Sequence, residues 1–117
     1  MTPTTLWTNQ DPYSNFAEQP ITGLQDITNF TYLKVQFYVS TSNTTIFESV
    51  HPVDYLGDGE TASTPIWLFG NINTGGSTRF RIVKKLSDTS IKITDVKGLA
   101  GGTSNSDTIP IKIIGLK

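Results

Sequence analysis

The sequence predicts an all-β chain that folds as a single antiparallel β-sandwich, jelly-roll-like, over residues 1–117. Apolar and polar residues alternate with a period of two along most of the chain, while helical periodicity is almost missing. Turn segments rich in Gly, Ser and Asn separate the alternating runs at short intervals, which is typical of sandwiches and jelly rolls. A length of 117 residues corresponds to one domain.

The first half of the chain contains the clearest strand, YLKVQFYVS at 32–40. Its apolar side chains stand at every second position, so one face is expected to be buried and the other solvated. The apolar face carries Leu33, Val35, Phe37 and Val39. A turn is expected at 41–45 and a short strand at 46–50. A loop containing a proline, two glycines and three acidic residues then fills 51–64 and leads to an apolar strand at 66–69.

The second half contains the best hairpin, with strands at 78–86 and 90–96 joined by Ser-Asp-Thr. In the later strand, Ile91 and Ile93 are expected to face the core. The earlier strand has one face with Phe80, Ile82, Lys84 and Leu86, and another with Arg79, Arg81, Val83 and Lys85. Its basic residues are expected to form a solvated strip, or to contact the acidic segment 54–60 of a neighbouring subunit.

The last strand, IPIKIIGLK at 109–117, is apolar on both faces. One face carries Ile109, Ile111 and Ile113, and the other carries Lys112, Ile114 and Leu116. Pro110 has no N–H to donate to a ladder, which predicts that this strand begins on an edge. A strand with two apolar faces needs cover on both. The second face is therefore expected to lie against a second layer or a neighbouring subunit.

Composition argues against several classes of function. A net charge of -1 with 16% charged residues does not fit nucleic-acid binding, which needs clustered Lys and Arg. The chain has no Cys and hence no disulfide or thiolate metal site. Its start, MTPTTLW, lacks the regions of a signal peptide, and no apolar run is long enough to cross a bilayer. We expect a protein made and assembled in a cytoplasm, without membrane insertion.

Candidates for catalysis are few. His51 is the only histidine in the sequence, which argues against a His-based triad or a His-rich metal site. Asp54, Asp58 and Glu60 lie close together on the predicted loop and raise the alternatives of a Ca²⁺ site or an acid/base pair. A solvated acidic loop is favoured, because the ligand spacing of an EF-hand is absent. The chain is expected not to be an enzyme and to use no cofactor.

Both ends of the chain resemble a family of small phage-encoded β proteins. The first segment, LWTNQDPYSNFAEQPI at 6–21, shares an aromatic-apolar opening and spaced Asn, Pro, Phe and Gln positions. The matching residues are Leu6, Trp7, Asn9, Pro12, Phe16, Gln19 and Ile21. RFRI at 79–82 is similar in type, and IPIKIIGLK is similar to the family's terminal strand, where Tyr more often stands at the place of Ile114. The resemblance covers about a third of the chain and no part of 41–78.

This resemblance implies a bacteriophage virion structural protein of the tail, the baseplate or the capsid surface, where it would serve in capsid decoration. Such a protein acts by contacts between subunits, here with copies of itself as a trimer and with other virion proteins. The contacts would come from loops at 41–45, 51–64, 71–77 and 98–107 and from the outward residues of the last strand. The candidate contact residues are Trp7, Arg79, Arg81, Ile114 and Leu116.

An alternative function is a receptor-binding or carbohydrate-binding module that recognises glycan on the host cell surface. Tyr38 is expected on the polar face of its strand and Tyr55 on the acidic loop. Aromatic faces stack on sugar rings, and neighbouring carboxylates accept hydrogen bonds from hydroxyl groups. The candidate glycan contacts are therefore these two tyrosines together with Asp54 and Asp58. Packing of the tyrosines at the edge of the sandwich or against a partner chain is favoured over glycan binding.

Overall fold

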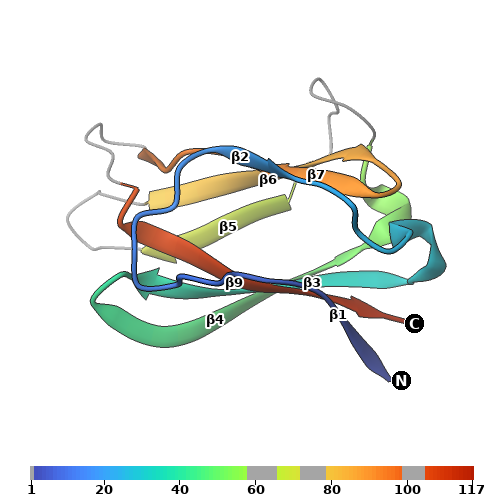
Figure 1. The fold of residues 1–117 in the computed structure, drawn as a ribbon, viewed down its shortest axis with the longest axis horizontal. Helices are drawn as coiled ribbons and strands as arrows, with labels where there is room; N and C mark the ends of the chain where they lie inside the picture. The colour runs from blue at the N-terminus through green and yellow to red at the C-terminus, as the bar shows by residue number, and fades with distance from the viewer. Residues whose placement is uncertain (1, 58–65, 72–78, 99–104) are drawn as a thin grey trace.

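The structure, a computed structural model, describes residues 2–57, 66–71, 79–98 and 105–117. Two antiparallel sheets pack face to face as a β-sandwich (Figure 1), which confirms the fold class that the sequence predicts. The first sheet has the order β1 (Pro3–Thr8), β9 (Asp107–Leu116), β3 (Tyr32–Ser40), β4 (Asn43–Pro52). The second has the order β2 (Gln19–Ile21), β7 (Ser90–Ile93), β6 (Arg79–Ser87), β5 (Ile66–Asn71), and β8 (Lys97–Gly98) also pairs with β6. Two short 3₁₀ helices, η1 (Ile27–Asn29) and η2 (Val53–Tyr55), lie outside the sheets.

Each sheet pairs an early strand of the chain with a late one. The first and last strands, β1 and β9, are neighbours in one sheet, while β2 and β7 are neighbours in the other. The inner strands do not alternate between the sheets, because β3 and β4 form a hairpin within the first sheet and β5, β6 and β7 form a meander within the second. The chain therefore crosses between the sheets after β1, and this crossover shapes the site described below.

Most predicted strands are found where the alternation placed them. β3 has the predicted bounds, and Ile91 and Ile93 of β7 are fully buried in the core. β4 is longer than predicted, because a tight turn at 41–42 lets the strand begin at Asn43. β1 and β2 were not predicted, since β1 alternates only over four residues before a register shift between Thr5 and Trp7, and β2 has only three residues. Asn71 of the predicted loop at 71–77 belongs to β5, and the rest of that loop and most of 98–107 fall outside the described residues.

On β6, the face that carries Arg81 and Lys85 is buried and not solvated. Arg81, Val83 and Lys85 are buried on the side of this strand that faces the core. The register explains this, because Arg81 pairs with Leu68 and Lys85 pairs with Ile91, and directly paired residues share a face. Both pairing partners are fully buried core residues. The prediction that Arg81 and Lys85 lie on a solvated strand face is therefore wrong.

β9 is a central strand over its second half and an edge over its first. Pairing with β1 runs only from Lys112 to Leu116, whereas pairing with β3 continues to Asp107. Pro110 lies in the half with a single neighbouring strand, next to a register shift opposite Phe37. The proline thus stands where no ladder hydrogen bond is required of its nitrogen, as the sequence predicts.

Candidate functional site

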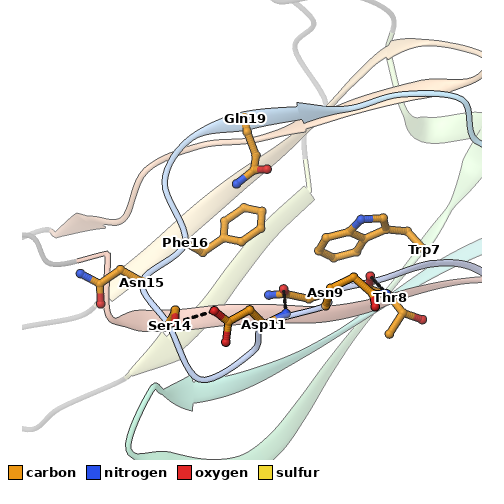
Figure 2. Close-up of a pocket in the computed structure, with 9 residues that line it drawn as sticks. Trp7, Thr8, Asn9, Asp11, Ser14, Asn15, Phe16 and Gln19 are labelled. Carbon is orange, nitrogen blue, oxygen red and sulfur yellow. Dashed lines mark hydrogen bonds between the residues drawn. The ribbon is translucent and has the colours of Figure 1, made fainter.

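The chain segment 9–18 crosses from the end of β1 to β2 and forms the wall of a hollow on the side of the sandwich (Figure 2). The hollow has a volume of about 350 Å³. Seven of its nine lining residues have polar side chains, and the other two are the aromatic residues Trp7 and Phe16. The residues that define it are Trp7, Asn9, Asp11, Ser14, Phe16 and Gln19. We refer to it below as the crossover hollow.

The two aromatic rings of the crossover hollow differ in exposure. Phe16 is buried and belongs to the core, whereas Trp7 is only partly buried and packs against that core. Their ring centroids are 6.0 Å apart in an edge-to-face arrangement. Figure 2 shows the two rings turned toward one another, with the Gln19 side chain directed toward Phe16. The hollow thus has an apolar end at the core and a polar surface along the crossover.

Hydrogen bonds fix the crossover to the sheet it leaves. Asn9 donates from its side chain to the carbonyl of Pro110 (2.9 Å) and from its backbone to that of Ile111 (2.8 Å). The Asn9 side-chain oxygen accepts the N–H of Asp11 (2.9 Å), and Asp11 in turn accepts the hydroxyl of Ser14 (2.7 Å). Such side-chain bonds to nearby backbone groups hold a turn in place. They preset the polar wall of the hollow.

The far end of the crossover is fixed by Asp95. Its carboxylate accepts the N–H of Glu18 (2.8 Å) and the side-chain amide of Asn105 (2.9 Å). These hydrogen bonds, with the backbone bond from Glu18 first, lower the pKa of Asp95. Lys92 lies 3.8 Å from the Glu18 carboxylate. The crossover is therefore held at both ends by contacts to other parts of the sandwich.

Arg81 lies beneath the crossover and holds it from the inside. Its side chain is fully buried, and the guanidinium carbon lies 5.3 Å from the centroid of the Phe16 ring. It donates to the carbonyls of Phe16 (2.7 Å), Thr94 (2.9 Å), Thr108 (2.7 Å), Asn105 (3.1 Å) and Asp107 (3.1 and 3.4 Å). Burial lowers its pKa to about 10, against the opposing effect of nearby carboxylates, so the group stays charged at neutral pH.

Because of this burial, Arg81 does not reach the protein surface and is removed from the set of candidate subunit contacts. Arg79 is partly exposed, and its Nε lies 3.7 Å from the carboxylate of Asp107 in the same chain. The two arginines are two positions apart on β6 and therefore share a face of the sheet, but Arg81 is fully buried and Arg79 is only partly exposed. No continuous basic strip is formed by them.

The other candidate subunit contacts lie in different environments. Ile114 is only 8% exposed and lies between Thr5 of β1 and Lys34 of β3. Leu116 is partly exposed at the end of β9, and Trp7 is partly buried in the crossover hollow. At Ile114, the second face of β9 is thus largely covered by neighbouring residues of the same sheet. The apolar side chains that are most exposed lie on other segments of the chain.

That exposure is found on the outer face of the first sheet. Ile46 and Val50 of β4 are 53% and 49% exposed. Ile46 pairs with Tyr38 of β3, and Tyr38 stacks on Tyr13 of the crossover at 6.2 Å between ring centroids. We refer to Tyr13, Tyr38, Ile46 and Val50 as the outer patch. Sequence alternation placed Tyr38 on the polar face of β3, and in the structure it is partly exposed while also packing against the core. Only the register placed it beside Ile46.

The outer patch surrounds a polar contact. Between Ile46 and Val50, the carboxylate of Glu48 accepts the side-chain amide of Gln36 (2.7 Å) and lies 3.5 Å from the ammonium of Lys34. The bond from Gln36 is the larger cause of the lowered pKa of Glu48. A surface that combines exposed apolar side chains with oriented polar groups is suited to contact with another protein.

The residues proposed for glycan contact do not form one site. Tyr38 lies near the end of β3, while Asp54 and Tyr55 lie in η2, after the strand position that pairs with the start of β3. Six residues of an extended strand separate the two ends of this hairpin, a span of about 20 Å. Tyr55 is 72% exposed. Asp58 and Glu60 fall outside the described residues. The predicted alternative of a metal site on the acidic loop therefore also lies outside them.

Within the described residues, no group of three or more His, Asp or Glu side chains is placed to hold a metal ion. None of the helices in that part of the chain has the length and apolar character needed to span a membrane. His51 is partly buried on β4, and its Nε2 contacts the hydroxyl of Ser49. Comparison with known proteins adds no relative, since no family model, curated protein or solved structure matches the chain significantly.

Proposed function

We propose that this β-sandwich is a structural protein of a bacteriophage virion, which works by contact with copies of itself and with other virion proteins. The single observation that carries the contact role is the outer patch. Exposed apolar surface is costly in a small protein that works alone, and a face on which several exposed apolar side chains gather commonly marks a site of protein interaction. The assignment to a virion rests on the resemblance of residues 6–21, 79–82 and 109–117 to phage-encoded β proteins.

The rigidity of the sandwich also supports this role. The fully buried Arg81 joins the crossover, β9 and the segment after β7 through their carbonyls. A contact surface that is already ordered loses little conformational entropy on assembly. The outer patch, on paired strands of such a body, is therefore suited to repeated, identical contacts in a symmetric assembly.

The contact role can be tested by light scattering of the purified protein over a range of concentrations. We expect association beyond the monomer, which weakens in I46K and in V50K because a buried lysine charge opposes assembly. T44K is the matched control, because Thr44 is exposed on the same strand and does not belong to the outer patch. A wild-type protein that remains monomeric at every concentration, or equal association of all variants, would contradict self-contact through this patch.

The virion assignment has its own test. Flanking genes that encode capsid, tail or baseplate proteins, together with detection of this chain in purified phage particles by mass spectrometry, are expected. If the flanking genes encode unrelated cellular proteins and the chain is not found in the particles, the virion assignment is wrong. The contact role would still be tested separately by the light-scattering experiment.

A further inference from the structure

We propose that the crossover hollow binds a neutral sugar ring of a glycan, with Trp7 as the stacking surface and the polar groups of Gln19 and Asp11 as hydrogen-bond partners. This goes beyond the assembly role, since it assigns a small-molecule site to a different surface. The outer patch presents side chains from β3 and β4 together with Tyr13 of the crossover, whereas the hollow is formed by other residues of the crossover, the end of β1 and the start of β2.

Size and composition restrict the ligand. A volume of about 350 Å³ lies at the small end of ligand sites, which run from about 300 to 1,000 Å³. Among the described residues, the lining contains no Lys, Arg or His, and Asp11 is the one charged side chain. An anionic ligand would meet a like charge without a counter-charge, and a purely apolar ligand would leave the polar wall desolvated. A neutral, hydroxyl-rich molecule with one apolar face fits both constraints.

The aromatic ring supplies the apolar contact. Trp7 packs one part of its indole against the core and Phe16, yet remains partly exposed at the hollow. The axial C–H groups of a pyranose form a flat apolar face that packs against such a ring. The indole N–H of Trp7 makes no hydrogen bond within the described part of the chain, so it is also available as a donor.

Unused polar atoms supply the directional contacts. Gln19 donates one N–H to the carbonyl of Ala17 (3.1 Å), and its side-chain oxygen accepts no hydrogen bond from the described residues. Asp11 accepts the hydroxyl of Ser14 through one carboxylate oxygen, and the other accepts no hydrogen bond from the described residues. Amide and carboxylate oxygens accept hydrogen bonds from adjacent hydroxyl groups of a sugar. Both side chains are exposed, so a ligand can reach them.

The site is ordered before any ligand arrives. Asn9 fixes the start of the crossover to β9, Arg81 holds the carbonyl of Phe16, and Asp95 holds the backbone of Glu18. A wall held in this way does not have to be ordered on binding, which lowers the entropic cost for a weakly interacting ligand. We expect affinities in the millimolar range for a single sugar, as for a small and polar ligand in a shallow site.

The test is a two-dimensional ¹H–¹⁵N NMR titration of the whole chain with a panel of neutral methyl glycosides and disaccharides, up to tens of millimolar. The chain has two tryptophans and therefore two indole N–H signals, and Trp67, on β5, serves as an internal control. We expect the signal of Trp7 to shift in a saturable way with at least one sugar, while the signal of Trp67 stays in place. Shifts of backbone amides should be concentrated in residues 7–19.

Variants separate binding from folding. Gln19→Ala is expected to weaken the titration by about threefold to tenfold, which is the value of one hydrogen bond. Gln25→Ala is the matched control, because Gln25 is also exposed and lies outside the hollow. Trp7→Phe keeps a ring against the core and removes the indole N–H and part of the stacking surface, and it too should weaken binding.

Three outcomes would overturn the proposal: no movement of the Trp7 signal with any sugar in the panel, equal movement of both indole signals, or identical titrations of Gln19→Ala, Gln25→Ala and the wild type. None of these outcomes touches the light-scattering result for the outer patch. The sugar site and the assembly role can therefore fail separately.

Discussion

Replacement of Arg81 by Met is the sharpest test of how this sandwich is held together. The methionine side chain has a similar length and fills much of the same space, but it has no N–H to donate. The substitution thus removes six hydrogen bonds to five backbone carbonyls without leaving a large cavity. Three of those carbonyls, of Phe16, Thr94 and Thr108, form bonds with Arg81 that are fully buried.

Two opposing free energies set the size of the effect. Burial lowers the Arg81 pKa to about 10, and this shift corresponds to a net cost of keeping the buried charge of about 3 kcal/mol, which the variant no longer has. Against this, each buried carbonyl that loses its donor costs about 1–3 kcal/mol, so three of them cost about 6 kcal/mol. The balance is a loss of about 3 kcal/mol in the free energy of unfolding, similar to the breaking of other buried charged networks.

The assay is urea unfolding at neutral pH, followed by tryptophan fluorescence and circular dichroism. Arg79→Met is the matched control on the same strand, because its partly exposed ion pair with Asp107 is worth about 0–1 kcal/mol. Arg81→Lys is expected to lose nearly as much as Arg81→Met, since one ammonium cannot reach carbonyls on all sides. An Arg81→Met protein as stable as Arg79→Met would refute the reasoning.

Three further predictions concern single residues. Gly115→Ala should destabilise the fold by about 1–3 kcal/mol in urea unfolding, because its Cβ would lie 2.6 Å from ring atoms of buried Phe30, and an unchanged midpoint would contradict this packing. Thr108→Val should stabilise it by about 1 kcal/mol, since the Thr108 hydroxyl is buried without a partner, and a loss would show that the hydroxyl is satisfied. Burial lowers the pKa of His51, so stability should fall as pH drops below about 6.5, the value for the unfolded chain. His51→Gln should flatten that slope between pH 7 and 5, and parallel curves for both proteins would contradict it.

Much of the architecture follows from local pattern. The bounds of β3, the hairpin of β6 and β7, and the edge character of β9 at Pro110 were all readable from alternation and from the chemistry of proline. The short strands β1 and β2 were not, since three to six residues with mixed burial carry too little periodicity. Their position decides where the crossover runs, so the hollow was missed with them. Trp7 was singled out by sequence, but as a subunit contact.

Site residues were harder to predict than strands, because a site gathers residues that are distant in sequence. The outer patch joins Tyr13 to Tyr38 and Ile46, which only strand register and the path of the crossover bring together. Tyr38 and Tyr55 share a residue type and a predicted exposure, yet they belong to opposite ends of one hairpin. Composition indicated that aromatic side chains are exposed, and it gave no information on which of them are neighbours.

By itself, the sequence determined that this protein is built from antiparallel strands with two chemically distinct faces, because a period of two is a local property of the extended chain. It did not determine which face of β6 would be buried, since alternation is unchanged when the two faces are exchanged. The tertiary structure buries the face that carries Arg81. It does so by bringing carbonyls from the crossover, from Thr94 and from the start of β9 around the guanidinium group. A charge can be buried only where such partners converge, and their convergence exists only once the two sheets have packed.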